Sequence, residues 1–142
     1  MPHVAELVIH IVDDEQIVRD SLGYLLKSMG YQTRTYSGAD EFLTTVSYDA
    51  PCCMLLDFFM GEKGGLQLLA ELPSHGLDFP VIAMTGSGDS EAKSRAIALG
   101  AAYFIEKPFG KQAITEALTS CAARAQEAAL RQQRMVKDQG GC

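Results

Sequence analysis

Short apolar runs alternate with helix-forming segments along this chain, and no other feature of the sequence constrains the fold as strongly. A continuous apolar run of four to six residues is typical of a strand that is covered on both faces of a sheet. The five runs are Leu7–Val12, Thr33–Tyr36, Cys52–Leu56, Pro80–Met84 and Ala102–Ile105.

Helical patterns fill the segments between the runs. Glu15–Met29 carries apolar residues at helical spacing, and Gly30 follows it as a C-terminal stop. A second helix is expected from Ser37, as an N-cap with Asp40 three residues on, to Val46. The remaining helices are expected at Gly65–Leu72, at Ser90–Leu99 between the cap Asp89 and the stop Gly100, and from Lys111 onward.

Strand and helix therefore alternate five times. This order predicts an α/β fold, a parallel sheet with helices on both of its faces. In such sheets the functional site lies at the carboxyl ends of the strands, where the strand order reverses.

Polar residues follow four of the apolar runs at that expected edge. Asp13 and Asp14 follow the first run, Asp57 the third, Thr85 the fourth, and Lys107 comes just after the fifth. Because the carboxyl ends of parallel strands meet at one edge of a sheet, three carboxylates, a hydroxyl and an amine are expected to lie close together.

This combination of groups favours phosphoryl transfer. Three neighbouring carboxylates repel one another and suit a hard cation such as Mg²⁺, which also partners phosphate. A carboxylate can act as a nucleophile and form an aspartyl phosphate. The amine of Lys107 and the hydroxyl of Thr85 can contact phosphoryl oxygens, and this transfer depends mainly on positioning and on neutralisation of charge.

Each residue alone also has an ordinary structural explanation. Asp13 and Asp14 could form a turn that caps the following helix, and Asp57 or Thr85 could be cap or turn residues. Lys107 could be a solvated side chain. Their joint occurrence at four strand ends is what favours a site.

Four segments of the chain resemble the response-regulator receiver domains of two-component systems. The resemblance implies a flavodoxin-like sheet of order 2-1-3-4-5, with a receiver domain at residues 1–122 and a helical linker or extension at 123–142. The amino-acid sequence is similar to those of the FixJ-type (LuxR/NarL-like) subgroup. Members of this subgroup commonly carry a C-terminal helix-turn-helix transcription domain. The segments are His10–Glu15, Leu55–Met60, Val81–Gly86 and Phe104–Phe109.

The resemblance implies a role for each residue of the reaction and of the switch. Asp57 would accept the phosphoryl group from a phosphohistidine on a sensor histidine kinase, and Lys107 would contact it. Thr85 would move toward it, and Phe104 would change rotamer in step. The peptide bond before Pro108 would be cis.

The resemblance also implies a Mg²⁺ site, in which Mn²⁺ or Ca²⁺ could substitute. Asp14 and Asp57 would bind the ion, Asp13 would assist, for instance through water, and the backbone carbonyl of Phe59 would be a further ligand.

The loop after Asp57 departs from the family pattern. Gly61 stands where a proline is usual, and the glycine-rich segment 61–65 is expected to be mobile. Phe59 is bulky beside the site, which leads to the hypothesis that it restricts water and prolongs the phosphorylated state. A fast dephosphorylation that Phe59→Asn slows no further would count against it.

The expected partners are proteins. A phosphorylation-dependent homodimer is expected through the Ser90–Leu99 helix and the last helix. The last helix also carries a four-three pattern, which could be a coiled-coil seam but is weak beyond Leu118, so an Ala-rich solvated linker is the alternative. The pattern comprises Ile114, Leu118, Cys121, Ala125, Ala128, Gln132 and Met135.

Charge and the chain ends narrow the range of functions. Residues 1–110 contain seven basic and fifteen acidic residues, a net charge of −8, so DNA contact would need a further domain.

No signal peptide, membrane segment or paired zinc-type cysteine spacing is present, which favours a cytoplasmic protein with reduced thiols. The helix that runs past the expected domain end favours a truncated regulator over a natural stand-alone one.

Two other interpretations of the sequence are alternatives to a phosphorylated receiver domain. An aspartate-nucleophile phosphohydrolase of the haloacid-dehalogenase type would need a second Asp two residues after Asp57, where this chain has Phe59. A degenerate receiver would act by protein contact alone, but the full set of polar residues argues against it. The chain is therefore expected not to be an enzyme beyond its own phosphorylation and dephosphorylation.

Overall fold

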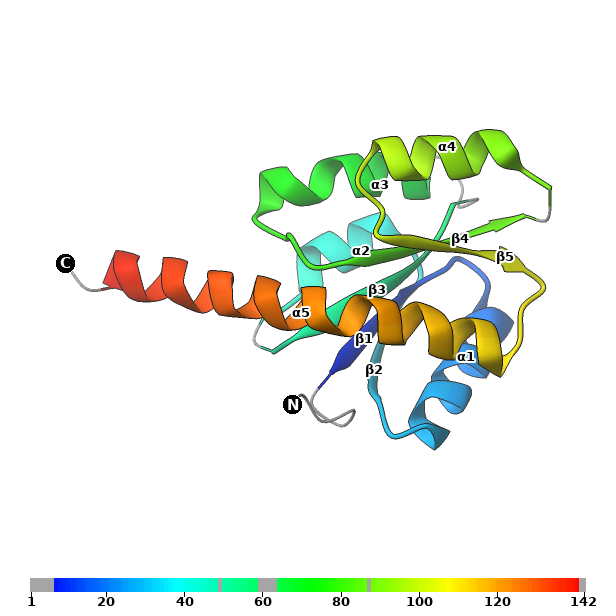
Figure 1. Cartoon of the computed structure of the whole chain (residues 1–142), viewed down its shortest axis with the longest axis horizontal. Helices are drawn as coiled ribbons and strands as arrows, with labels where there is room; N and C mark the ends of the chain where they lie inside the picture. Colours follow the sequence, from blue (N-terminus) through cyan, green and yellow to red (C-terminus); the bar gives the residue numbers. More distant parts are fainter. Residues whose placement is uncertain (1–6, 49, 59–63, 87, 141–142) are drawn as a thin grey trace.

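In the computed structural model, five parallel strands alternate with helices (Figure 1). The structure describes residues 7–48, 50–58, 64–86 and 88–140, and of 135–140 it describes the backbone. The strands are β1 (Val8–Val12), β2 (Gln32–Tyr36), β3 (Cys52–Asp57), β4 (Val81–Gly86) and β5 (Tyr103–Lys107). The helices are α1 (Gln16–Ser28), α2 (Ala39–Thr45), α3 (Gly65–Glu71), the 3₁₀ helix η2 (Leu72–His75), α4 (Ser90–Ala98) and α5 (Lys111–Gly140).

The strands form one sheet in the order β2-β1-β3-β4-β5, and every neighbouring pair is parallel. Helices α1 and α5 cover one face, while α2, α3 and α4 cover the other (Figure 1). A separate apolar cluster fills each layer, with Leu26 and Leu118 in one and Phe42 and Leu68 in the other. The predicted α/β fold and its flavodoxin-like order are confirmed.

The burial of the strands follows their place in the sheet. All residues of β1 and β3 are buried, as expected for strands with a neighbour on each side and helices on each face. The expectation of cover on both faces is wrong for β2, in which only Tyr36 is buried. This strand lies at the edge of the sheet and carries the polar sequence Gln-Thr-Arg-Thr-Tyr, and β1 is the one strand with which it pairs.

The helix ends mostly agree with the sequence signals. Gly30 and Gly100 have the positive φ angles of 96° and 102° that glycine tolerates after a helix. The carboxylate of Asp89 accepts a hydrogen bond of 3.0 Å from the backbone N–H of Ala92, which confirms it as the cap of α4. Ser37 as the cap of α2 is wrong, because Gly38 holds that position.

Ser37 instead makes a local contact with a different acidic residue than Asp40. Its backbone N–H donates to the carboxylate of Glu41 over 3.0 Å, and its hydroxyl donates to the same oxygen. The acidic partner of Ser37 is therefore four residues along the chain, whereas the capping-box pattern predicts a partner three residues along.

The apolar stripe of α5 packs on the sheet of its own chain. Ile114, Leu118, Cys121 and Ala125 are buried in the cluster between α5, α1 and the sheet. The coiled-coil interpretation is therefore wrong for this part of the helix, since these side chains are not available to a second protomer. The side chain of Met135 lies outside the described residues.

Contacts between α5 and the rest of the domain continue as far as Arg131. Ala128 is buried, and Nε of Arg131 lies 3.3 Å from Oδ2 of Asp78, in the loop before β4. Burial thus continues beyond residue 122, and the predicted division of the chain there stays a prediction. Among the described residues, no helix combines the length and the apolar character that a membrane span requires.

Three of the four cysteines lie in the apolar core. Cys52, Cys53 and Cys121 are buried, and burial raises the pKa of Cys53 and of Cys121 above the ordinary value for a thiol. A thiol with a raised pKa is a weak nucleophile, so these residues act as core packing groups.

Candidate functional site

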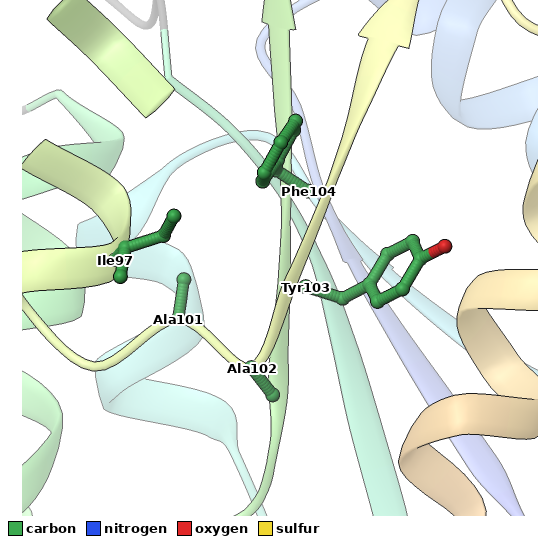
Figure 2. Close-up of a pocket in the computed structure, with 5 residues that line it drawn as sticks. All are labelled: Ile97, Ala101, Ala102, Tyr103 and Phe104. Carbon is green, nitrogen blue, oxygen red and sulfur yellow. The ribbon is translucent and has the colours of Figure 1, made fainter. Parts of the chain in front are cut away.

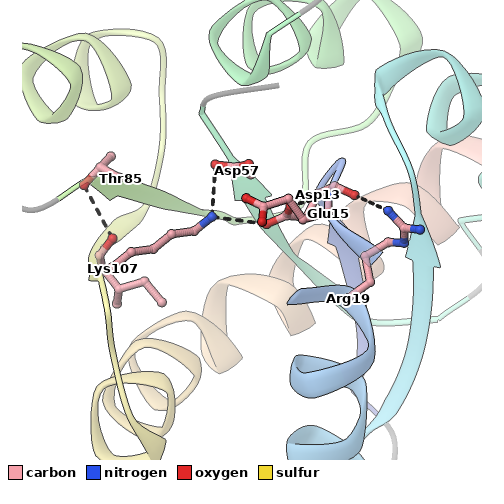
Figure 3. A network of polar contacts seen from close by, with 7 residues as sticks. Asp13, Glu15, Arg19, Asp57, Thr85 and Lys107 are labelled. Carbon is pink, nitrogen blue, oxygen red and sulfur yellow. Dashed lines mark hydrogen bonds and ion pairs between the residues drawn. The ribbon is translucent and has the colours of Figure 1, made fainter. Parts of the chain in front are cut away.

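The carboxyl edge of the sheet brings the predicted polar residues to one place (Figure 3). Asp57 is the last residue of β3 and Lys107 the last residue of β5, while Asp13 follows β1 directly. The register aligns these ends, because Val12 of β1 pairs with Leu56 and Asp57 pairs with Met84 of β4. The convergence expected from strand order is confirmed for the three aspartates and Lys107.

Lys107 ends the outermost strand β5, and its side chain reaches the aspartates after β1 and at the end of β3. Its Nζ is 3.3 Å from Oδ2 of Asp13 and 3.4 Å from Oδ1 of Asp57 (Figure 3). Both aspartates are buried, with exposed fractions of 0% and 2%, which carboxylates rarely tolerate without a partner. The explanation of Lys107 as a solvated side chain is therefore wrong.

The same neighbours keep Lys107 positively charged. Partial burial lowers the pKa of this amine, but the carboxylates of Asp57 and Asp13 outweigh that effect and raise the pKa above its ordinary value. A permanent positive charge thus faces the two buried aspartates.

The carboxylates form a cluster with the chemistry of a metal site. Asp13, Asp14 and Asp57 each offer an oxygen, and these oxygens lie within 4.8 Å of one another. The charge of one lysine cannot balance the charges of three carboxylates. Asp14 is exposed to solvent, so a cation at this cluster could keep part of its water. Oxygen ligands together with water suit a hard divalent cation. The donor set fits Mg²⁺. Phe59, the further predicted ligand, lies outside the described residues.

Asp13 is held by three contacts. Its Oδ1 accepts a hydrogen bond of 2.9 Å from the backbone N–H of Glu15, and its Oδ2 faces Lys107. Its backbone carbonyl accepts a bond of 2.8 Å from Nη1 of Arg19. Asp13 therefore closes the turn after β1 but does not cap α1, whose N-cap is Glu15. Arg19 is not among the residues predicted from the sequence, and only its position one turn into the helix after the aspartates indicates it.

Thr85 lies beside the cluster and faces the neighbouring strand. It is fully buried within β4, and its hydroxyl donates to the backbone carbonyl of Ile105 over 3.5 Å (Figure 3). A plain turn residue is thus excluded. The structure brings Asp13, Asp14, Asp57 and Lys107 together and leaves Thr85 engaged with β5.

The two remaining switch candidates lie on and after β5. Phe104 is partly buried, and Figure 2 shows it on the side of β5 that faces α4. The Lys107–Pro108 peptide bond is cis, as the family resemblance implies. The roles of Phe104 and Pro108 in a switch stay predictions.

Gly65 contributes to the site through its backbone. The sequence predicts both a mobile glycine-rich segment 61–65 and a helix that begins at Gly65, and the helix start is confirmed, because Gly65 is the buried first residue of α3. A Cβ on Gly65 would collide with the backbone carbonyl oxygen of Asp57 and lie 2.9 Å from Cα of Phe58. Glycine is required here because two backbones approach closely; residues 61–63 lie outside the described part of the chain.

Gly65→Ala is expected to lower the free energy of unfolding by about 2 kcal/mol, because the backbone behind Asp57 must move to admit the methyl group. Urea unfolding measures this change. Gly23→Ala in α1 is the control, since its Cβ would meet only Oγ1 of Thr33 at 4.0 Å, and it should be neutral or slightly stabilising. Equal changes in the free energy of unfolding for the two substitutions would contradict the close approach of Gly65 to the backbone of Asp57.

Comparison with known proteins identifies the family. Residues 9–119 match the model of the response regulator receiver domain, and the chain belongs to this family. It is a receiver domain with an acidic pocket of Asp13, Asp14 and Asp57 and with Lys107 beside it. The chain is 40% identical over 122 residues to the transcriptional regulatory protein FixJ of Azorhizobium caulinodans, covering 85% of this chain and 57% of that protein.

Further relatives support the same subgroup. The chain is 35% identical over 132 residues to the transcriptional regulatory protein TdiR of Thauera aromatica, covering 91% of this chain and 57% of TdiR. A crystal structure of FixJ-N superposes with a TM-score of 0.78 at 32% identity, covering 87% of this chain and 96% of that one. The resemblance to FixJ-type transcriptional regulators is confirmed. The chain spans little more than half the length of these curated relatives.

Proposed function

We propose that this chain accepts a phosphoryl group on Asp57 from a phosphohistidine of a sensor histidine kinase. The observation that carries the proposal is the buried Asp57 carboxylate, 3.4 Å from the Lys107 amine and grouped with two further aspartates. An ordinary structural ion pair needs one carboxylate for one lysine. A surplus of buried carboxylates is costly and is typical of a functional site.

The reaction uses Asp57 as the nucleophile. A carboxylate oxygen of Asp57 attacks phosphorus, the phosphorus–nitrogen bond to the histidine breaks, and its electron pair stays on the imidazole. Lys107 already lies beside that carboxylate and pairs with the charge that arrives on the phosphoryl oxygens. Thr85 would exchange its contact with Ile105 for one of those oxygens.

The metal site belongs to the same step. Asp14 and Asp57 would hold Mg²⁺ directly, with the Phe59 carbonyl as a further ligand and Mn²⁺ or Ca²⁺ as substitutes. Both oxygens of Asp13 have partners within the chain, which supports an assisting role for it through water. When bound, Mg²⁺ supplies the positive charge that three carboxylates and a phosphoryl group require.

Phosphorylation would then change a protein-binding face. The departure of Thr85 from Ile105 would open space into which Phe104 turns, and the α4–β5–α5 face would bind a second protomer. In this scheme the chain catalyses only its own phosphorylation and dephosphorylation and turns over no external compound. It would work in the cytoplasm and reach DNA only through a transcriptional output domain such as the family resemblance implies.

The test is the intact mass of the protein after incubation with acetyl phosphate. With Mg²⁺ we expect the gain of one phosphoryl group, and with EDTA none, because the carboxylate cluster repels a phosphate donor in the absence of the ion. No gain from acetyl phosphate and none from histidine kinases would favour the degenerate receiver. Release of phosphate from a generic phosphomonoester would favour the phosphohydrolase, which Phe59 makes the weaker candidate.

A further inference from the structure

A lysine of α4 contacts both the ring of Phe104 and an acidic neighbour on the same strand. Nζ of Lys93 forms an ion pair with Oε1 of Glu106 and lies 5.2 Å from the centroid of the Phe104 ring. The side chain of Lys93 is only 23% exposed, so the amine is partly withdrawn from water, where ion pairs and cation–π contacts are stronger.

Strand geometry explains why one amine reaches both partners. Phe104 and Glu106 are two residues apart on β5, so their side chains lie on the same face of the sheet, the face covered by α4. Figure 2 shows Tyr103 on the opposite side, toward α5. Lys93 therefore joins α4 to β5 across the aromatic ring.

The two residues that Lys93 contacts flank Ile105, the residue to which Thr85 is hydrogen-bonded. Glu106 pairs in register with Thr85, and the hydroxyl of Thr85 donates to the carbonyl of Ile105, between Phe104 and Glu106. A movement of Thr85 away from β5 therefore occurs directly beside the two residues that Lys93 contacts.

Packing next to the Phe104 ring is open. Phe104 borders a cavity of about 360 Å³ that is also lined by Ile97, Ala101, Ala102 and Tyr103 (Figure 2). The small side chains of Ala101 and Ala102 leave space next to the ring, so close packing does not by itself restrict it there. The contact with Lys93 is a specific restraint on this orientation.

We propose that Lys93 is a positioning residue of the switch, which holds Phe104 in the present orientation through its joint contact with the ring and Glu106. This inference rests on the proposed role of Phe104 as the switch aromatic. Loss of the lysine charge is expected to increase the population of the alternative ring orientation about fivefold, the scale expected for one partly exposed ion pair with a cation–π contact.

The experiment uses fluorine NMR of the unphosphorylated protein labelled with 4-fluorophenylalanine. Lys93→Met removes the charge and keeps the apolar stem, and Glu106→Gln removes the partner charge. Both are expected to shift and broaden the Phe104 signal in the same direction. The double variant is expected to do no more than Lys93→Met, whereas Lys93→Arg should restore the wild-type signal, because a guanidinium also stacks on rings.

Arg95→Met is the matched control. It removes the exposed Arg95–Glu91 pair of 2.7 Å on the same helix and should leave the Phe104 signal unchanged. An unchanged Phe104 signal in both Lys93→Met and Glu106→Gln would overturn the inference. So would an equal change in Arg95→Met, which would indicate a general effect of charge on α4.

A second readout links the restraint to phosphorylation. Lys93→Met is expected to take up phosphate from acetyl phosphate about fivefold faster than wild type, because the alternative orientation belongs to the phosphorylated state, while Arg95→Met should react at the wild-type rate. If no variant is phosphorylated, the proposed function fails and the ring signal still decides the role of Lys93. An NMR change without faster uptake would overturn the link to the switch.

Discussion

Asp57→Asn is expected to abolish phosphoryl uptake and, in metal-free solution, to raise the free energy of unfolding by about 1 kcal/mol. An amide is not a nucleophile for phosphorus, so the gain in mass from acetyl phosphate should disappear. The gain in stability follows from the charge balance at the site. The substitution removes repulsion from Asp13 and Asp14, whose oxygens lie within 4.8 Å, and leaves Lys107 paired with Asp13.

Urea unfolding in EDTA and in Mg²⁺ measures both parts of this prediction. Added Mg²⁺ should stabilise the wild type more than Asp57→Asn, because the variant has lost a ligand of the ion. Asp20→Asn, an exposed aspartate on α1, is the control and should change stability by less than about 0.5 kcal/mol. Phosphoryl uptake by Asp57→Asn, or a loss of stability in EDTA, would contradict the assigned site.

Lys107→Met is expected to lower the free energy of unfolding by about 3 kcal/mol in EDTA. Methionine has a similar apolar stem but no charge, so Asp13 and Asp57 would remain buried without the amine that lies 3.3 Å and 3.4 Å from them. A buried carboxylate that loses its cation carries most of its desolvation cost uncompensated.

Mg²⁺ should restore much of that loss, because a cation held by the same carboxylates replaces the missing charge. Unfolding curves with and without Mg²⁺ test this. Lys111→Met, at the exposed start of α5, is the control and should be close to neutral. If Lys107→Met unfolds like this control in EDTA, the ion pairs contribute little and the charge balance described here is wrong.

Local patterns in the sequence were enough to predict most of the architecture. Apolar runs identified the buried central strands, Gly30 and Gly100 identified helix ends, and Asp89 identified a cap. Each of these signals acts within a few residues, where backbone sterics and local hydrogen bonds decide the conformation. The polar site was also predictable, because parallel strands bring their carboxyl ends to one edge whatever the exact packing.

The tertiary structure decided the features that depend on contacts between distant segments. The collision that forces glycine at position 65 exists only because α3 begins against the backbone of β3. The carbonyl contact of Arg19 and the joint contact of Lys93 with Phe104 and Glu106 likewise need neighbouring elements in place.

The last helix illustrates the same division. The four-three spacing of Ile114, Leu118 and Cys121 predicted an apolar stripe, but a stripe on another helix and the face of a sheet are equally good partners for it. The sequence by itself thus determined which side chains must be buried and which charges meet at the sheet edge. Only the tertiary structure decided what covers that stripe, because burial of apolar surface is non-directional and the choice of partner depends on the whole chain.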